Sequence, residues 1–303
     1  MHLSLRDKFI LNMDIFIYAY SYNENSGGVI ALHRLCHLIN EVTNHQAYLV
    51  PHRKYGLRQD VKYIFKKPKL DVHTEWNTPI WRKKTFPKNS IVVYPEIVKG
   101  NPLNIKNVVR WLLHNPGNFT GEIDYGDGEL YYRYSSGFSY DVAYQSKLSN
   151  LFLNVKYTPF DIYYEDTEVQ RDIEICYLVR KGVNKVFVHP VDSFCIDDKS
   201  HKEIAEIFRR SKRFISYDSY TAYSHFAVLC GCESIVVPEE GISIEQWYPD
   251  ISDRYGLSYG FGQEQMDWAY MTRKNLAERL IAADAMSTES VKNCLDEIFN
   301  YFS

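Results

Sequence analysis

The sequence predicts an α/β fold that consists of two halves, each with strands and helices in alternation. Apolar runs such as 14–20, 90–98 and 108–114 are rich in β-branched and aromatic residues, as is typical of strands buried on both faces of a parallel sheet. Several runs are followed by stretches with apolar residues three and four positions apart, which predict helices. With 303 residues, the chain is long enough for two domains with a core each.

The elements expected in the first half follow this pattern closely. A strand at 14–20 precedes a helix at 27–43 and a short strand at 47–51, and two further strands are expected at 90–98 and 108–114. The stretch 115–150 is rich in Gly, Tyr and Ser, so we interpret it as a functional loop with one or two short strands.

The second half repeats the alternation after a connecting segment. Residues 155–172 are polar, aromatic and acidic, which indicates a connection between two domains. Strands are then expected at 173–179, 185–190, 213–218 and 234–238, and helices at 200–211 and 219–231. A last amphipathic helix is expected at 287–302. We therefore expect a first domain at 1–157, a second at 158–286, and a closing helix at 287–303 that packs back on the first domain.

The composition limits the possible classes of function. The formal net charge of −3 argues against a nucleic-acid-binding protein, which usually has a strongly basic face. Nowhere do 18 consecutive apolar residues occur, so no membrane span is expected, while a peripheral contact with a membrane stays open. The first residues lack the pattern of a signal peptide, and the six cysteines lack the spacing of a zinc site, so we expect a cytoplasmic protein with reduced thiols.

The stretch Ser26-Gly27-Gly28 is the first candidate site, because it connects the strand at 14–20 to the helix at 27–43. A glycine pair lets the backbone come close to a ligand, and the start of a helix presents free N–H groups and a partial positive charge to an anion. The alternative is a plain turn between strand and helix, with Ser26 as N-cap. Both interpretations stay open from these residues alone.

The second half contains two candidate motifs for a phosphate group. Arg180, Lys181 and Gly182 follow the strand at 173–179, and cations beyond the carboxyl ends of parallel strands suit phosphates. The alternative is a solvated basic turn. A cluster of hydroxyl side chains at the start of the helix at 219–231 could bind a diphosphate, or it could only cap that helix; its members are Ser219, Tyr220, Thr221 and Ser224.

The order of these motifs resembles the GT-B glycosyltransferases. Arg180–Gly182 and the stretch 227–237, "AVLCGCESIVV", match the layout of the C-terminal domain in that family, and Gly27 and Gly28 match its glycine-rich turn after the first strand. The resemblance implies two Rossmann-like domains that face a cleft. It also implies transfer of a sugar from a nucleotide-sugar donor to a saccharide acceptor, in surface glycan synthesis.

The resemblance also implies roles for individual residues. The donor would be bound by Gly27, Gly28, Arg180, Lys181, Ser219, Tyr220, Thr221 and Glu245, with Glu239 and Glu240 as alternatives to Glu245 for the sugar hydroxyls. His114 stands where many members have a histidine that faces the donor sugar. If the reaction inverts the anomeric centre, Glu24 in the loop after the first strand would be the general base. The alternative for Glu24 is a carboxylate that stabilises the helix dipole.

The sequence departs from the family at the ribose-binding position. Retaining members often have a Glu-x₇-Glu pair at the strand–helix junction, and here Asp218 and Phe226 stand at these two positions, with His225 beside them. Two other hypotheses therefore stay open. One is a nucleotide-sugar enzyme such as a non-hydrolysing epimerase, and the other is a catalytically inactive GT-B-like protein that binds a nucleotide or sugar.

No metal or other cofactor is expected, because GT-B enzymes commonly neutralise the leaving diphosphate with cations, hydroxyls and helix N-termini. Acidic residues do occur in the stretches 124–129 and 197–198, which could suggest a metal site. Isolated acidic residues beside glycines are more often turn residues. The expected partners are thus a nucleotide-sugar and a glycan acceptor, without nucleic acid.

Overall fold

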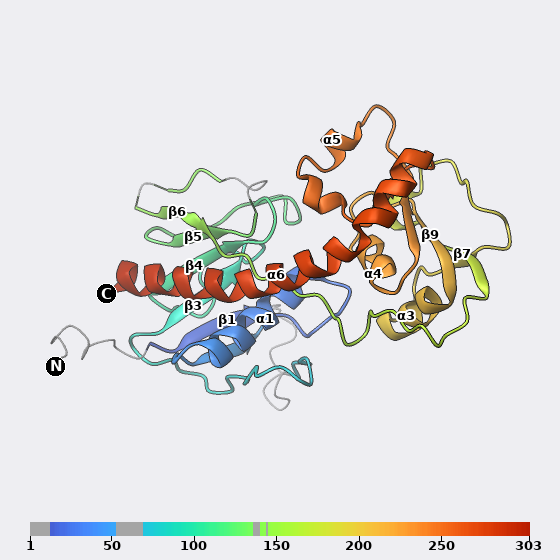
Figure 1. The fold of residues 1–303 in the computed structure, drawn as a ribbon. Helices are drawn as coiled ribbons and strands as arrows, with labels where there is room; N and C mark the ends of the chain where they lie inside the picture. The colour runs from blue at the N-terminus through green and yellow to red at the C-terminus, as the bar shows by residue number, and fades with distance from the viewer. Residues whose placement is uncertain (1–12, 53–68, 136–139, 144) are drawn as a thin grey trace, which may run out of the picture. The chain divides into compact units, whose positions relative to one another are not determined.

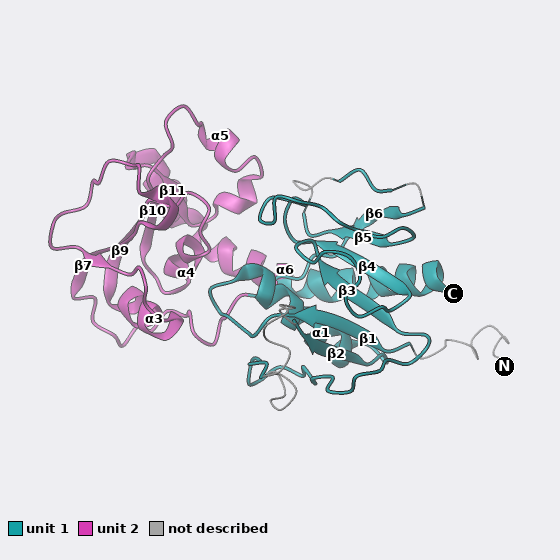
Figure 2. Ribbon diagram, turned by 180° about the vertical axis from the view of Figure 1, so that it is seen from behind, with its two compact units in different colours: residues 1–157, 284–303 teal, residues 158–283 magenta. Residues whose placement is uncertain are grey.

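The protein is described by a computed structural model that covers residues 13–52, 69–135, 140–143 and 145–303 (Figure 1). The chain divides into two compact units (Figure 2). Unit 1 comprises Met1–Tyr157 and Asp284–Ser303, and unit 2 comprises Thr158–Ala283. In the part of the chain that is described, no helix is both long and apolar enough to cross a membrane.

Unit 1 contains a parallel sheet with the strand order β2-β1-β3-β4-β5-β6. The strands are β1 (Ile15–Ala19), β2 (Ala47–Pro51), β3 (Ile91–Pro95), β4 (Asn107–Leu112), β5 (Leu130–Arg133) and β6 (Lys147–Phe152). Every residue of β1 and β3 is buried, which explains why their sequences are apolar without alternation. β5 and most of β6 lie in the stretch 115–150, so the one or two short strands expected there are confirmed, although β6 extends to Phe152.

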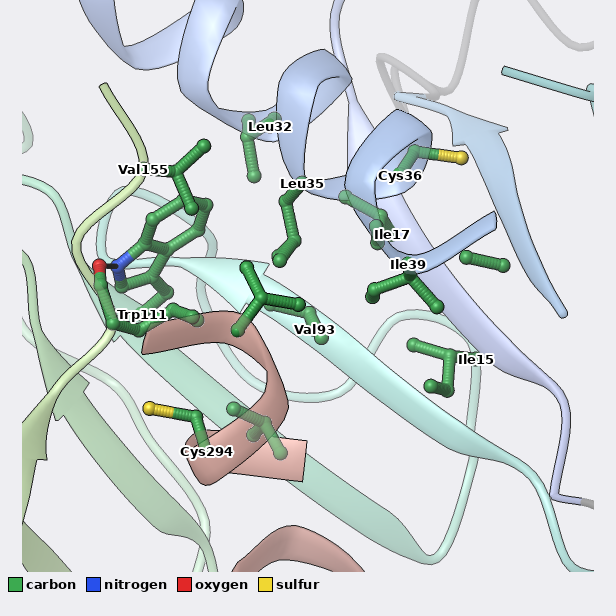
Figure 3. Close-up of a cluster of buried hydrophobic side chains, with 14 of the residues drawn as sticks. Ile15, Ile17, Leu32, Leu35, Cys36, Ile39, Val93, Trp111, Val155 and Cys294 are labelled. Carbon is green, nitrogen blue, oxygen red and sulfur yellow. Dashed lines mark hydrogen bonds between the residues drawn. The ribbon is translucent and has the colours of Figure 1, made fainter. Parts of the chain in front are cut away.

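The core of unit 1 lies between one face of this sheet and two helices (Figure 3). Helix α1 (Gly27–Val42) contributes Leu32, Leu35 and Ile39, whose spacing places them on one face of the helix. The last turns of helix α6 (Gln263–Phe302) contribute Val291 and Cys294 to the same cluster. The opposite face of the sheet has a second cluster, in which strand residues contact side chains from loops.

Unit 2 contains a second parallel sheet, with the order β11-β10-β9-β7-β8. The strands are β7 (Ile173–Leu178), β8 (Phe194–Cys195), β9 (Ser211–Ser216), β10 (Glu233–Val236) and β11 (Leu257–Tyr259). The helices are α3 (His201–Arg210), α4 (Tyr223–Leu229) and α5 (Ile244–Trp247), with short 3₁₀ turns η2 (Arg180–Gly182) and η3 (Ile251–Arg254). The α/β class with two parallel sheets is thus confirmed, and both sheets are consistent with Rossmann-like domains.

Three expected elements differ from the structure. The strand predicted at 185–190 is wrong: this segment has no strand partner in the described part of the chain, and Val186, Phe187 and Val188 are 81%, 55% and 49% exposed. The helix predicted from 219 begins at Tyr223. The last helix begins at Gln263 rather than at 287. Its first half was missed because its apolar stripe is narrow; Leu276 belongs to this stripe and packs against residues of β10 and β11.

Candidate functional site

The strand order defines one candidate site in each unit. In both sheets the first strand along the chain lies between the second and the third: β1 lies between β2 and β3, and β7 between β8 and β9. The chain therefore leaves the first and the third strand in opposite directions along the sheet. Ligands of open α/β sheets bind in the crevice at the carboxyl ends of two such neighbouring strands. We refer to these two places as the switch points of unit 1 and unit 2.

The switch point of unit 1 contains a buried carboxylate, Glu96, directly after β3. Its side chain accepts a hydrogen bond from the Leu113 N–H at 3.1 Å, and the residue is only 6% exposed. Burial raises the pKa of Glu96, while hydrogen bonds from its own backbone and from the backbone of Leu113 and His114 act against this rise. Tyr20, directly after β1, also has a raised pKa, through burial and through the charges of Tyr18 and Glu96. A carboxyl group with this environment is a candidate for proton transfer.

His114 lies next to this carboxylate, but Glu24 has a different environment. His114 is half-buried after the end of β4, and its ring contacts Phe119 at a centroid distance of 4.9 Å. Glu24 is exposed on the turn that precedes α1. Sequence reasoning therefore selected the exposed acidic residue of this region and missed the buried one. The signal that could have found Glu96 is its position as the first acidic residue after a continuous apolar strand.

Gly27 and Gly28 form the first turn of α1, and neither has a positive φ. A Cβ atom at Gly28 would lie 3.6 Å from Leu113 Cδ1, which is an ordinary contact, and a Cβ atom at Gly27 would have no atom within 4 Å. The backbone conformation therefore does not require glycine at either position. The contact with Leu113 shows that the start of α1 lies beside the end of β4, next to His114. Ser26 is the N-cap residue, although its side chain makes no capping hydrogen bond in the described structure.

In unit 2, the turn after β7 packs directly on the end of β9. A Cβ atom at Gly182 would lie 2.3 Å from the Tyr217 carbonyl oxygen, so only glycine fits at this point. Arg180, two residues earlier, has a φ of 40°, which is a strained conformation for a residue with a side chain. Its exposed guanidinium lies 5.2 Å from the centre of the Tyr223 ring, whereas the exposed Lys181 has no such contact with a described residue.

Lys185 is the cation that connects the strand ends of unit 2. Its Nζ donates hydrogen bonds to Ser219 Oγ at 2.7 Å and to the Val237 carbonyl at 2.6 Å. Burial lowers its pKa, and the nearby charges of Glu239 and Asp218 raise it. The sequence motif Arg180–Gly182 pointed to this turn, but the third cation of the segment "RKGVNK" makes the contact with the predicted hydroxyl cluster.

The hydroxyl residues of the cluster have different environments. Ser219 and Thr221 are buried, and the Thr221 hydroxyl accepts a hydrogen bond from the Tyr223 N–H at 3.3 Å. Tyr220 is 56% exposed, so it can contact a ligand. The Ser224 hydroxyl is buried and has no hydrogen-bond partner among the described residues. Helix α4 has only seven residues and Ala222 as its N-cap, so its dipole is a weak part of this site.

Glu245 is not joined to this cluster by its side chain. It is exposed in the first turn of α5, where it accepts a hydrogen bond from Ser243 Oγ at 2.9 Å. Its pKa is lowered by a backbone hydrogen bond and by Ser243. The neighbouring Trp247 does reach the cluster, since its Nε1 donates to the Ser219 carbonyl at 2.8 Å. Phe226, at the expected ribose position, is buried and stacks on Tyr163 with ring centres 4.3 Å apart.

Two of the acidic residues considered for a metal have structural contacts: Glu129 accepts hydrogen bonds from the buried Arg110 guanidinium, and Asp197 holds the end of β7. Asp197 accepts the Val179 N–H at 2.9 Å at the end of β7. Among the residues that the structure describes, no group of three or more His, Cys, Asp or Glu side chains could hold a metal ion. The sequence matches no known protein-family model, and a search of curated proteins gives no significant relative.

Proposed function

We propose that this protein is a GT-B-type glycosyltransferase that moves a sugar from a nucleotide-sugar to a saccharide acceptor in surface glycan synthesis. One observation carries the proposal: the same switch-point topology occurs twice, with different chemistry at each. Unit 2 has Arg180, Lys185 and Tyr220 at its strand ends, and unit 1 has Glu96 and His114. Cations and hydroxyls suit a diphosphate, whereas a buried carboxyl beside an imidazole suits proton transfer.

In this proposal, unit 2 binds the donor. The guanidinium of Arg180 and the ammonium groups of Lys181 and Lys185 neutralise the diphosphate, and the Tyr220 hydroxyl donates to a phosphate oxygen. Gly27 and Gly28, at the positive end of α1, are retained for the donor only as the resemblance implies. Glu245 is retained for the sugar hydroxyls only as the resemblance implies, because its carboxylate serves the first turn of α5.

The transfer step needs a base and a leaving group. Glu96, in its ionised form, takes the proton of the acceptor hydroxyl. The acceptor oxygen then forms a bond to the anomeric carbon while the bond from that carbon to the phosphate oxygen breaks. The electron pair of that bond leaves with the nucleoside diphosphate, whose added charge is stabilised by the cations of unit 2. We favour Glu96 over Glu24 as the base, because the buried carboxylate has the environment of a proton-transfer group. His114 would contact the donor sugar.

A second candidate is a protein that binds a nucleotide-sugar without turnover. It is favoured by Phe226, whose ring is part of the core at the position where the family holds the ribose with a carboxylate. Under this alternative, the switch point of unit 2 would bind the diphosphate, and Glu96 would serve only to hold the backbone of Leu113.

Two measurements test the proposal. The purified protein is first combined with sugar nucleotides of the common bases, and its melting temperature is recorded; we expect at least one nucleotide to raise it. The same nucleotide is then supplied with saccharide acceptors, and we expect release of nucleoside diphosphate that depends on the acceptor. Binding without release supports the second candidate. A melting temperature that no nucleotide changes contradicts both.

A further inference from the structure

A group of exposed cations lies at the amino-terminal end of the unit 1 sheet, the end opposite to Glu96. Arg82, Lys83 and Lys84 form the tip of a loop that is closed by a hydrogen bond from Trp81 Nε1 to the Thr85 carbonyl at 3.3 Å. The loop is attached to the sheet, since the Trp81 N–H donates to the Leu49 carbonyl of β2 at 2.9 Å.

Aromatic side chains fix the base of this loop. The rings of Trp81 and Phe86 each lie 4.9 Å from the ring of Phe16 in β1, and both pack on the apolar cluster of that sheet face. Because the two rings flank the three cations in the sequence, both ends of the loop are anchored on the sheet. The ammonium of Lys83 lies 5.0 Å from the centre of the Trp81 ring.

Two more cations lie at the same end of the sheet. Lys88 is exposed in the turn before β3, and Lys106 is exposed directly before β4. The two strands start side by side, since Ile91 pairs with Asn107 and the Asn107 amide donates to the Ser90 carbonyl at 3.2 Å. We call these five residues, Arg82, Lys83, Lys84, Lys88 and Lys106, the basic edge.

Most charges of the basic edge have no oppositely charged partner within the described structure. None of the five cations belongs to an ion pair in the described ranges. The carboxylate of Asp14 is near enough to interact with Lys83, so the charge of Lys83 is partly compensated. The other four cations have no ion-pair partner in the described ranges, and a cluster of this kind attracts an anionic surface.

We propose that the basic edge binds the anionic headgroups of a lipid membrane. Four of its five cations are lysines, which act as mobile point charges and suit a fluid layer of headgroups. Nucleic acid fits less well. Single strands need aromatic faces on which bases stack, and the ring of Trp81 is occupied by Phe16, Tyr48 and Lys83. The formal net charge of −3 also opposes a polyanion that would extend over the rest of the protein.

The expected binding is weak, reversible and sensitive to salt. A lysine or arginine near an anionic membrane surface contributes about a fivefold increase in affinity. Removal of the three loop cations should therefore weaken the binding by about a hundredfold. High salt should have a comparable effect, because it screens charges that are exposed to solvent. This inference is independent of the transfer reaction, so the two proposals can fail separately.

The test is co-sedimentation of the full chain with lipid vesicles. We expect binding to vesicles of phosphatidylcholine with phosphatidylglycerol at low salt, and little binding to phosphatidylcholine alone. The variant R82A/K83A/K84A should lose the binding. The control K202A/K274A/K292A removes three exposed helix cations outside the basic edge and the same net charge, and it should bind as the unchanged protein does.

Several outcomes would overturn the proposal. Equal binding of the loop variant and the unchanged protein would place the contact elsewhere, and equal loss in the control would reduce it to overall charge. Binding to neutral vesicles would indicate insertion of apolar side chains. If the unchanged protein binds an RNA oligonucleotide at a lower protein concentration than vesicles, the RNA displaces the vesicles, and the loop variant does not bind the RNA, the basic edge is a nucleic-acid site. Circular dichroism and melting temperature of all variants confirm that they are folded.

Discussion

The two switch points have the same topology but use their residues in opposite ways. In unit 1, the strand ends hold a buried carboxylate, and the glycines beside them have space for a side chain. In unit 2, the strand ends hold cations that reach hydroxyls and carbonyls, and Gly182 has no space for even a methyl group. The comparison teaches that a conspicuous glycine pair in a sequence need not mark the place where the backbone is most constrained. Five predictions test this comparison.

The largest expected effect is that of Glu96→Gln on turnover. If Glu96 is the general base of the proposed transfer, turnover should fall by about 10²–10⁴-fold, while nucleotide binding in unit 2 stays unchanged. The measurement is acceptor-dependent release of nucleoside diphosphate, with the nucleotide affinity as control. Glu24→Gln is the matched variant, since it removes an exposed carboxylate of the same region and should leave turnover nearly unchanged. A loss of turnover in Glu24→Gln with normal turnover in Glu96→Gln would indicate that Glu24 is the base.

The same substitution has a consequence for stability that does not depend on catalysis. Burial raises the pKa of Glu96 in the folded protein above its ordinary value of 4.5. The group therefore favours folding below pH 4.5, and this contribution is lost as the pH rises through the raised pKa. The glutamine of Glu96→Gln cannot ionise. The free energy of unfolding of this variant, minus that of the unchanged protein, should therefore be more positive near neutral pH than in acid. Denaturant titrations of the two proteins below pH 4.5 and near neutral pH measure this difference. A difference of the opposite sign would show that the folded protein stabilises Glu96 as a carboxylate.

Gly182→Ala is expected to have the next largest effect, because its Cβ would lie 2.3 Å from the Tyr217 carbonyl oxygen. Insertion of a methyl group into a packed site typically costs about 1–3 kcal/mol, and here the nearest atoms belong to the backbone, so we expect a loss near 3 kcal/mol in the free energy of unfolding. The measurement is chemical denaturation. Gly262→Ala is the matched control, since Gly262, like Gly182, has no positive φ, but its Cβ position has no described atom within 4 Å. A loss of under 1 kcal/mol in Gly182→Ala would mean that the turn moves to accept the methyl group.

Lys185→Met should weaken binding of the nucleoside diphosphate by about 10- to 100-fold, the value of one charge-assisted hydrogen bond to phosphate. The methionine keeps most of the apolar stem, so the packing of the turn should be preserved. Lys181→Met, a few residues earlier in the same turn, removes an exposed charge and should have a smaller effect. Equal effects of the two variants would indicate that the donor contacts the outer side of the turn rather than the strand ends.

The sequence could predict most elements but only part of the sites. Strands such as β1 and β3 are buried on both faces, so their apolar runs identified them, although the strand predicted at 90–98 extends three residues beyond the end of β3. The strand predicted at 185–190 is wrong because the apolar residues of this segment are exposed, and exposure cannot be inferred from the hydrophobicity of the residues. The first half of α6 was missed because its apolar stripe is narrow: Leu276 is buried, but Tyr270 and Met271 are 63% and 74% exposed.

The site residues that were missed depend on contacts between distant segments. The position of Glu96 after an apolar strand is a local signal, but its environment depends on β4, which ends beside β3 and brings the Leu113 N–H to its carboxylate. Lys185 becomes a candidate because the turn after β7 crosses the ends of β9 and β10, so that its Nζ meets Ser219 and Val237. Neither contact has a signal in local spacing. Arg180, by contrast, could be found from its motif, since it directly follows the strand.

The smallest expected effects are those of the glycine pair, and they distinguish a turn from a ligand site. Alanine is a better helix former than glycine by up to about 1 kcal/mol, and neither position has a positive φ, so Gly27→Ala and Gly28→Ala should each leave stability unchanged or slightly increased. The Gly28 methyl group would contact Leu113 inside the protein, so turnover should be nearly normal in that variant. The Gly27 methyl group would enter open space in front of the helix, where the proposal places an anionic ligand. Turnover should therefore fall in Gly27→Ala while its melting temperature is maintained. If both variants are fully active, the two glycines belong to a plain turn, and the candidate site of unit 1 rests on Glu96 and His114 alone.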